Sequence, residues 1–229
     1  MTIQKIKQKS SKIQELFAFD ESHKKDVDFV IGTDEAGRGP GAGPVFAAAV
    51  CFKEINDNII QQLTILDDSK KLSEKHREEL YEIIVKNAIY YIKAGSVEEI
   101  DTNNILNTSL NCMKISVQQV NSQLGNKKTL TLVDGNKLIK QYKSKQKTIV
   151  KGDAKSAAIA AASILSKVSR DRFMYKIAKE FPQYDWENNK GYLTTKHIEA
   201  IKKYGTTKWH RKKFLRKILE PVTEQLELF

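Results

Sequence analysis

The feature that most constrains this chain is residues 28–52, where two apolar segments flank a glycine-rich connection. The segments DFVIGTD (28–34) and GPVFAAAVCF (43–52) are apolar between their ends. Short apolar runs bounded by glycine and proline are typical of buried β-strands. The sequence therefore predicts two buried strands joined by a glycine-rich loop, and any fold must place both strands inside a sheet.

The rest of the chain alternates between strand and helix patterns. Residues 72–88 offer Ser73 as a helix N-cap, and residues 154–181 begin with small side chains, which suit close packing. The order of these segments predicts an α/β or α+β fold in which helices cover a sheet. Further strands are predicted at 89–97, 128–135 and 147–153, and helices at 9–19, 72–88, 105–124 and 154–181.

We expect one unit with three consecutive parts: an N-terminal helical segment (1–27), a core (28–184) and a helical C-terminal extension (185–229). A chain of 229 residues, 40% of them hydrophobic, suits a single large domain with a small appendage. No apolar run approaches the ~20 residues that a membrane-spanning helix needs, and the charged N-terminus lacks a signal-peptide core. Cys51 and Cys112 lie far apart in apolar sequence, which fits a reducing compartment. We therefore expect a cytoplasmic protein.

The charge of the chain favours a polyanionic partner. The formal net charge is +11, and residues 196–217 hold nine basic residues and one acid. Tyr204 and Trp209 lie within that stretch, as stacking on bases or sugars would require. Residues 137–151 hold six lysines and no acid. Nucleic acid is the commonest partner of such a protein, although a solvated basic helix face gives the same pattern.

Four acidic residues stand at or beside predicted strand ends. Asp34 and Glu35 follow the first strand, Asp134 ends the fourth and Asp153 ends the fifth. Strand ends of an α/β sheet present side chains to a shared crevice, so these acids can converge. Carboxylates that crowd together raise one another's pKa unless cations hold them, and Mg²⁺ or Mn²⁺ prefers such oxygen ligands. The sequence thus predicts a two-metal site for phosphodiester hydrolysis.

Each acid also has a simpler interpretation. Asp153 is placed to cap the following helix, and Asp134 precedes Gly135-Asn136 as a turn residue would. The pair Asp34-Glu35 suits the acidic box of a nucleotide hydrolase, but the sequence has no GxxxxGK[ST] phosphate loop. We favour the metal site because it explains all four acids at once.

Five separated blocks resemble one family. The resemblance is to the type 2 ribonucleases H, of which bacterial ribonuclease HII is the nearest group, and it runs from about residue 29 to 214. It implies a ribonuclease H-like fold with a five-stranded mixed sheet flanked by helices. It also implies an endonuclease that hydrolyses RNA in RNA/DNA hybrids and incises 5′ of single ribonucleotides in duplex DNA. The blocks are GTDEAGRGPGAGPV, DDSKKLSEKHREEL, LVDGN, KGDAKSAAIAAASILSKVSRDR and NKGYLTTKHIEAIKKYG.

The resemblance assigns roles to individual residues. The metal-binding carboxylates would be the four acids above, holding Mg²⁺ or Mn²⁺ and giving 5′-phosphate and 3′-hydroxyl products. Gly37, Arg38 and Gly39 would form the GRG element, whose backbone reads the ribose 2′-hydroxyl. Tyr192 would stack on the sugar after the cut; without the resemblance it is an ordinary half-buried aromatic. Gly41 departs from the family, which usually has a bulkier apolar residue there, so we expect a looser loop.

Two further segments are candidate binding sites. Ser69, Lys70 and Lys71 precede a helix and could hold a phosphate, although a solvated loop explains them equally well. The C-terminal QLELF resembles the short peptide by which replication and repair proteins dock on the bacterial sliding clamp. A frayed helix end is the alternative. The docking residues would be Gln225, Leu226, Leu228 and Phe229.

Three rival functions remain open. Ribonuclease HIII shares the fold and the GRG element, but it typically has a larger N-terminal substrate-binding domain than the residues before the first strand could supply. A non-catalytic hybrid-binding module would need the charge but not the four acids. A nucleotide-driven motor would need the phosphate loop that is missing. Nothing in the sequence indicates more than a monomer.

Overall fold

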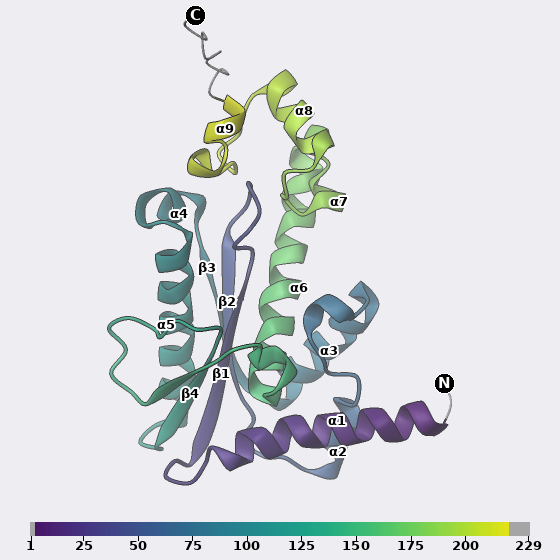
Figure 1. Ribbon diagram of the computed structural model, residues 1–229, viewed down its shortest axis with the longest axis vertical. Helices are drawn as coiled ribbons and strands as arrows, with labels where there is room; N and C mark the ends of the chain where they lie inside the picture. Colours follow the sequence, from purple (N-terminus) through teal and green to yellow (C-terminus); the bar gives the residue numbers. More distant parts are fainter. Residues whose placement is uncertain (1–2, 220–229) are drawn as a thin grey trace, which may run out of the picture.

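The computed structural model describes residues 3–219 and centres on one five-stranded sheet (Figure 1). The strand order is β3-β2-β1-β4-β5, in which β2 pairs antiparallel with β1 and β3, whereas β4 pairs parallel with β1 and β5. The mixed sheet and all five predicted strands are confirmed. The strands are β1 (Phe29–Ala36), β2 (Val45–Cys51), β3 (Ile89–Gly95), β4 (Thr129–Asp134) and β5 (Gln146–Ile149).

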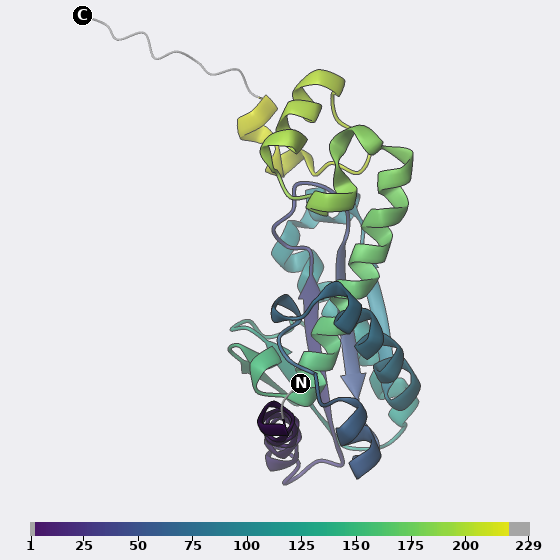
Figure 2. The ribbon, with the colours of Figure 1, turned by 90° about the vertical axis from the view of Figure 1, so that its right-hand side faces the viewer.

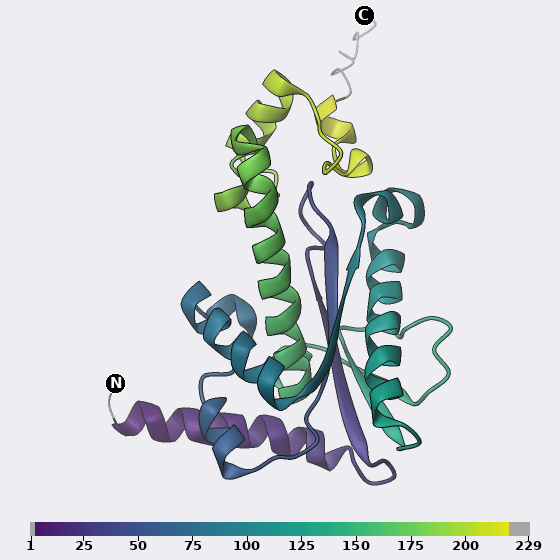
Figure 3. The same ribbon diagram turned by 180° about the vertical axis from the view of Figure 1, so that it is seen from behind.

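Helices cover both faces of the sheet, with α5 on one side and α6 on the other, as Figures 1 and 3 show. The predicted helices at 9–19, 72–88, 105–124 and 154–181 are confirmed, and Ser73 caps α3 by accepting the N–H of His76 at 3.3 Å. The helices are α1 (Ile3–Ser22), α2 (Asp57–Gln62), α3 (Glu74–Asn87), α4 (Val97–Asn103), α5 (Ile105–Leu124), α6 (Ala157–Glu180), α7 (Trp186–Asn189), α8 (Thr195–Tyr204) and α9 (Arg216–Leu219).

The small side chains at the start of α6 let this helix touch the central strand. A Cβ atom on Gly32 of β1 would lie only 2.2 Å from backbone atoms of Ala158 and Ile159. Only glycine fits such an approach, because any side chain would overlap the helix backbone. The close contact fixes α6 against β1 and so sets the position of every side chain that α6 directs toward the carboxyl end of that strand.

The N-terminal helix belongs to the same hydrophobic core. Ile13, Leu16 and Phe17 of α1 are buried, and the Asp20 carboxylate accepts the N–H of Ala158 at 2.9 Å. The boundaries that we drew at residues 27 and 184 therefore lie between secondary-structure elements. Their role as domain limits stays a prediction. Within residues 3–219, no helix is both long and apolar enough to span a membrane.

The C-terminal extension forms a small helical layer at the end of α6, above the sheet in Figure 2. Its core is aromatic: Tyr184 stacks on Trp186 with ring centroids 5.0 Å apart, and the Trp186 indole N–H donates to His197 at 3.0 Å. His197 and His210 are both buried. These four side chains form the buried core of the extension, and Lys202 and Lys203 at the end of α8 are exposed.

Candidate active site

Asp34 and Glu35 are consecutive residues of β1, so their side chains point to opposite faces of the sheet. Asp34 faces α6, where it accepts a hydrogen bond from Ser163, and is only 7% exposed. Glu35 faces α5 and accepts a hydrogen bond from Ser109. The acidic pair thus brackets the end of the strand rather than lying on one side of it.

The other two acids come to the same edge. β4 runs parallel to β1 with Val133 opposite Thr33, which brings Asp134 beside Asp34. Asp134 Oδ1 accepts the N–H of Gly152 at 2.7 Å, which ties β4 to the 3-10 turn Gly152–Ala154 that carries Asp153.

The simpler role considered for Asp153 is wrong. Helix α6 is capped by Ser156, whose hydroxyl accepts the N–H of Ile159 at 3.1 Å. Strand β5 ends at Ile149 rather than at Asp153, and Lys151 has a left-handed backbone (φ 55°) that turns the chain. The N-cap position of α6 is therefore filled by Ser156, and Asp153 is placed by this turn.

One cavity of about 500 Å³ brings all four acids together. The predicted convergence is confirmed, and the cavity also contains the GRG element and Tyr192. Its walls come from β1, β4, the turn before α6, α6 itself and the C-terminal extension. The lining residues are Asp34, Glu35, Ala36, Gly37, Arg38, Gly39, Ser69, Asp134, Asp153, Ser163, Lys167, Arg170 and Tyr192.

The electrostatics of the cavity favour a bound cation. Burial, together with the neighbouring Glu35 and Asp134, raises the pKa of Asp34 well above its usual range. Burial also raises the pKa of Glu35, against the opposing effect of Arg38, whose guanidinium lies 3.1 Å away. Crowded carboxylate oxygens are the donor set that Mg²⁺ and Mn²⁺ prefer. Within residues 3–219, no group of three or more histidine, cysteine, aspartate or glutamate side chains is arranged so that it could hold a metal ion.

The glycine-rich loop between β1 and β2 is held by two buried arginines. Arg211 donates to the carbonyls of Gly37, Arg38, Pro40 and Gly43 over 2.7–3.2 Å. Arg170 donates to the carbonyls of Ala42 and Pro44, both at 3.2 Å. Gly37 has a positive φ of 98°, which side chains rarely allow. The loop is thus rigidly shaped by its surroundings.

Arg211 was hidden from the sequence inside the basic stretch 196–217, which we assigned to phosphate contacts. Its side chain is fully buried, and burial beside Arg170 lowers its pKa to about 9. Trp209, which we expected to stack on nucleic acid, is half-buried and packs edge-on against Phe173 with ring centroids 5.2 Å apart. Both residues contribute to structure, whereas Tyr204 is 53% exposed and stays a candidate for stacking.

The expectation of a looser loop at Gly41 is wrong. A Cβ atom there would lie 2.6 Å from Leu193, so the space of a bulkier residue is already filled. The Gly41 N–H donates to the Gly191 carbonyl, and its own carbonyl accepts from the N–H of Arg211, both at 2.9 Å. The glycine therefore permits a tight junction between the loop and the C-terminal extension.

Tyr192 stands beside the GRG element. A Cβ atom on Gly39 would lie 3.3 Å from the Tyr192 ring, and the tyrosine side chain is 51% exposed toward the cavity. Its carbonyl lies 2.9 Å from His197 Nδ1, so the buried aromatic core holds its backbone. The ring is thus presented to a ligand beside the loop.

The comparisons with known proteins decide the family. A model described as Ribonuclease HII matches residues 31–217. The chain belongs to the ribonuclease HII family. It is 51% identical to ribonuclease HII of Fusobacterium nucleatum, over 92% of this chain and 94% of that one. It is 46% identical to ribonuclease HII of Pelagibacter ubique, over 82% and 96%. The protein is accordingly a ribonuclease H, an endonuclease that acts on the RNA of RNA/DNA hybrids.

Solved structures confirm the ribonuclease H-like fold. Ribonuclease HII of Archaeoglobus fulgidus, solved in complex with PCNA, gives a TM-score of 0.64 at 26% identity, over 80% of this chain and 93% of that one. Ribonuclease H2 of Pyrococcus horikoshii gives 0.64 at 26% identity, over 83% and 96%. A ribonuclease HIII solved with Mn²⁺ gives 0.65 at 14% identity, which shows a shared fold alone.

The predicted phosphate site is only partly in the cavity. Ser69 lines the cavity and its hydroxyl lies 2.9 Å from that of Ser163. Lys71 is outside the lining and lies 3.7 Å from Asp67. The side chain of Lys70 lies outside the described part of the structure. Binding roles for the three residues stay predictions.

The contribution of α6 to the cavity was not predicted from the sequence. Ser163, Lys167 and Arg170 all line the cavity and lie at spacings of four and three, which place them on one helical face. That polar face on an otherwise alanine-rich helix was the available signal. Lys167 pairs with Asp171 at 2.7 Å. The predicted clamp peptide, residues 225–229, lies outside the described residues.

Proposed function

We propose that this ribonuclease H activity uses a two-metal mechanism and that the protein also incises 5′ of single ribonucleotides in duplex DNA. The observation that carries this proposal is the single cavity that joins four carboxylates, the GRG loop and Tyr192. The first group suits phosphodiester chemistry, and the other two suit recognition of the sugar beside the cut.

The carboxylates would hold the metal ions. Asp34, Glu35, Asp134 and Asp153 supply only oxygen donors, and the first two have raised pKa values because their charges are buried together. Two divalent ions bound there would activate a water and stabilise the departing 3′-oxygen. The products would carry 5′-phosphate and 3′-hydroxyl ends.

The GRG loop would distinguish ribose from deoxyribose. A 2′-hydroxyl both donates and accepts hydrogen bonds, so backbone groups can read it when no side chain keeps them apart. Arg211 holds the carbonyls of Gly37 and Arg38 before any substrate arrives. A loop fixed in this way loses little entropy on binding, which favours affinity and selectivity.

Tyr192 would test the next sugar. Its half-exposed ring beside Gly39 can stack on a flat deoxyribose face, and a 2′-hydroxyl at that position would disturb the contact. This preference would direct the cut to the junction where RNA gives way to DNA. The Tyr192→Ala variant should lose selectivity for that junction more than it loses cleavage of long hybrids.

One gel tests the proposed function. A duplex with a single ribonucleotide is incubated with the protein and Mg²⁺, Mn²⁺ or EDTA. Metal-dependent incision on the 5′ side of the ribonucleotide is the expected result. Cutting of long RNA stretches alone would favour the ribonuclease HIII activity, and binding without any cutting would favour a hybrid-binding module.

The place of this activity in the cell is part of the proposal. A cytoplasmic enzyme of this kind would serve ribonucleotide excision repair and RNA primer removal. Docking on the bacterial sliding clamp through Gln225, Leu226, Leu228 and Phe229 fits that role, and the solved complex of the Archaeoglobus fulgidus relative with PCNA supports it. Deletion of residues 225–229 should abolish clamp binding and leave cleavage of free duplex unchanged; undiminished clamp binding rejects the proposal.

A further inference from the structure

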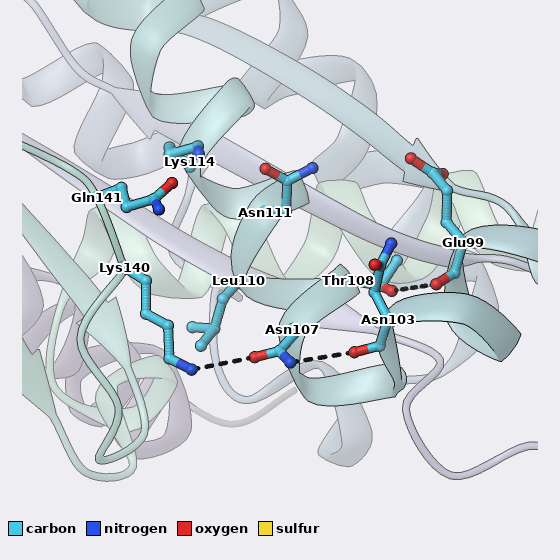
Figure 4. Close-up of a pocket in the computed structure, with 9 residues that line it drawn as sticks. All are labelled: Glu99, Asn103, Asn107, Thr108, Leu110, Asn111, Lys114, Lys140 and Gln141. Carbon is cyan, nitrogen blue, oxygen red and sulfur yellow. Dashed lines mark hydrogen bonds between the residues drawn. The ribbon is translucent and has the colours of Figure 1, made fainter.

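A second cleft lies outside the catalytic cavity, between α5 and the loop that joins β4 to β5 (Figure 4). It has a volume of about 450 Å³ and a predominantly polar lining. The proposed function uses none of its residues. They are Glu99, Asn103, Asn107, Thr108, Leu110, Asn111, Lys114, Lys140 and Gln141.

One wall of the cleft carries amide and ammonium side chains. Asn107, Asn111 and Lys114 lie at spacings of four and three on α5, so they share a face of that helix, whereas Asn103 ends α4 and accepts the Asn107 amide N–H at its carbonyl at 3.1 Å. Lys140 reaches from the opposite wall and donates to Asn107 Oδ1 at 3.3 Å, as Figure 4 shows. Amide and ammonium groups of this kind are the usual partners of phosphate oxygens.

The charge of the cleft suits an anion. Two lysines face one acid, Glu99, and that carboxylate is already engaged because its Oε2 accepts the N–H of Ser96 at 2.7 Å in a capping box. The adjoining segment 137–151 adds further lysines and no acid. A chain of phosphates can use such a surface at several points, which a small neutral ligand cannot.

Both walls belong to elements that also carry residues at or against the catalytic carboxylates. The loop that carries Lys140 begins after Asp134, the last residue of β4. On α5, the buried Ser109 bonds to Glu35, and Asn107 and Asn111 lie on the other, more exposed side of the same helix. A duplex held at the carboxylates can therefore extend over these two elements toward the cleft.

We propose that this cleft binds the phosphodiester backbone of the duplex away from the scissile bond. Lys114 and Lys140 contact phosphates, and the Asn111 amide donates to a phosphate oxygen between them. The inference rests on the proposed function, because it requires a nucleic acid in the catalytic cavity. The cleft contributes affinity and register, and the chemistry stays with the carboxylates.

A pair of matched double variants tests the cleft. Asn111→Asp with Lys140→Glu changes two exposed cleft residues, and Asn58→Asp with Lys86→Glu makes the same changes at exposed positions on α2 and α3. Binding to an RNA/DNA hybrid is measured between low and moderate salt. The cleft variant should bind about tenfold more weakly than the parent at ~0.1 M salt, with a salt slope reduced by about 1, and its kcat should be unchanged. Equal affinities of the cleft and control variants would overturn the proposal.

Neutral linkages locate the contact. Methylphosphonate groups are placed one at a time along each strand of the hybrid, and binding of the parent and of the cleft variant is compared. One or two linkages should weaken binding of the parent but not of the variant, because the contact is already lost there. Equal losses at every linkage would contradict the cleft. A parent that binds hybrid without cutting it would overturn the proposed function. The binding comparisons would still show whether the cleft contacts the phosphodiester backbone.

Discussion

Two groups of buried charges flank the glycine-rich loop, and the protein treats them in opposite ways. The guanidinium groups of Arg170 and Arg211 are satisfied inside the fold by backbone carbonyls of residues 37–44. The carboxylates of Asp34 and Glu35 lie on opposite faces at the end of β1, and burial raises the pKa of both. One group is complete as folded, and the other is arranged for a ligand.

The two buried arginines therefore serve the structure of the loop, whereas the two carboxylates belong to the candidate site. A buried cation with every donor used stabilises one backbone shape, and its loss exposes several unsatisfied carbonyls. Buried anions that repel one another make the fold less stable until a cation arrives. Substitutions in the first group should therefore cost stability, and substitutions in the second should cost activity.

The largest effect is expected at the carboxylates. Asp34→Asn or Asp134→Asn should lower cleavage of a hybrid by a thousandfold or more in Mg²⁺, because a ligand of the proposed metal site is lost. The free energy of unfolding in EDTA should stay the same or rise, since a repelling charge has gone. Gel assays and urea titrations measure the two quantities. Near-parental cleavage by either variant would refute the assignment of the metal site.

Arg211 should show the reverse order of effects. Arg211→Ala should lower the free energy of unfolding by about 3–4 kcal/mol, because four loop carbonyls lose their donor. Arg211→Lys serves as the control: it keeps the charge but cannot reach four carbonyls, so it should recover little. Urea denaturation checks both variants. A loss below about 1 kcal/mol would show that the arginine does not hold the loop.

A third buried charge extends the comparison to pH. Burial raises the pKa of Asp20 from 3.8 to about 6, so the folded protein binds its proton more tightly than the unfolded chain does. The resulting stability, up to about 3 kcal/mol, is complete below pH 4 and is lost as the pH rises to about 6. Asp20→Asn keeps an acceptor for the Ala158 N–H and should flatten this dependence. An unchanged slope in urea titrations across pH 4–6 would contradict the role of Asp20.

The smallest effect is expected at Arg38. Its side chain is half-exposed and pairs with Glu35, in contrast to the buried arginines that hold the same loop. Exposed ion pairs contribute little, so Arg38→Ala should change the free energy of unfolding by less than about 1 kcal/mol. Thermal melts beside Arg211→Ala make the comparison. A loss as large as that of Arg211→Ala would erase the distinction between the two arginines.

The sequence was enough to predict the sheet and the acidic cavity. Strands such as 28–34 and 43–52 are continuous apolar runs, and the acids stand where parallel strands end, so chemistry and periodicity agree. Residues 57–62 and 97–103 form short helices that we did not predict. Helices of so few residues are marginal alone and depend on tertiary packing, which local sequence does not reveal.

The errors have physical reasons. Arg211 reads as one basic residue among many, because its burial depends on a loop some 170 positions earlier. Gly41 led us to expect a looser loop, yet Leu193 fills the space beside it. Asp153 is a plausible helix cap by its sequence position, but Ser156 is the N-cap of α6 in the structure. In the first two cases, the residue that determines the structure is distant in sequence. In the third, two nearby residues can each cap the helix, and the periodicity of the sequence does not distinguish them.

The hydrogen bonds from Arg211 to the loop carbonyls can form only late in the synthesis of the chain. The loop at 37–44 is made early, but the guanidinium that satisfies four of its carbonyls is made 167 residues after the end of that loop. A nascent chain can therefore assemble strands and carboxylates while its glycine-rich loop is still unfixed. The proposed selectivity for the sugar would then be acquired late in synthesis.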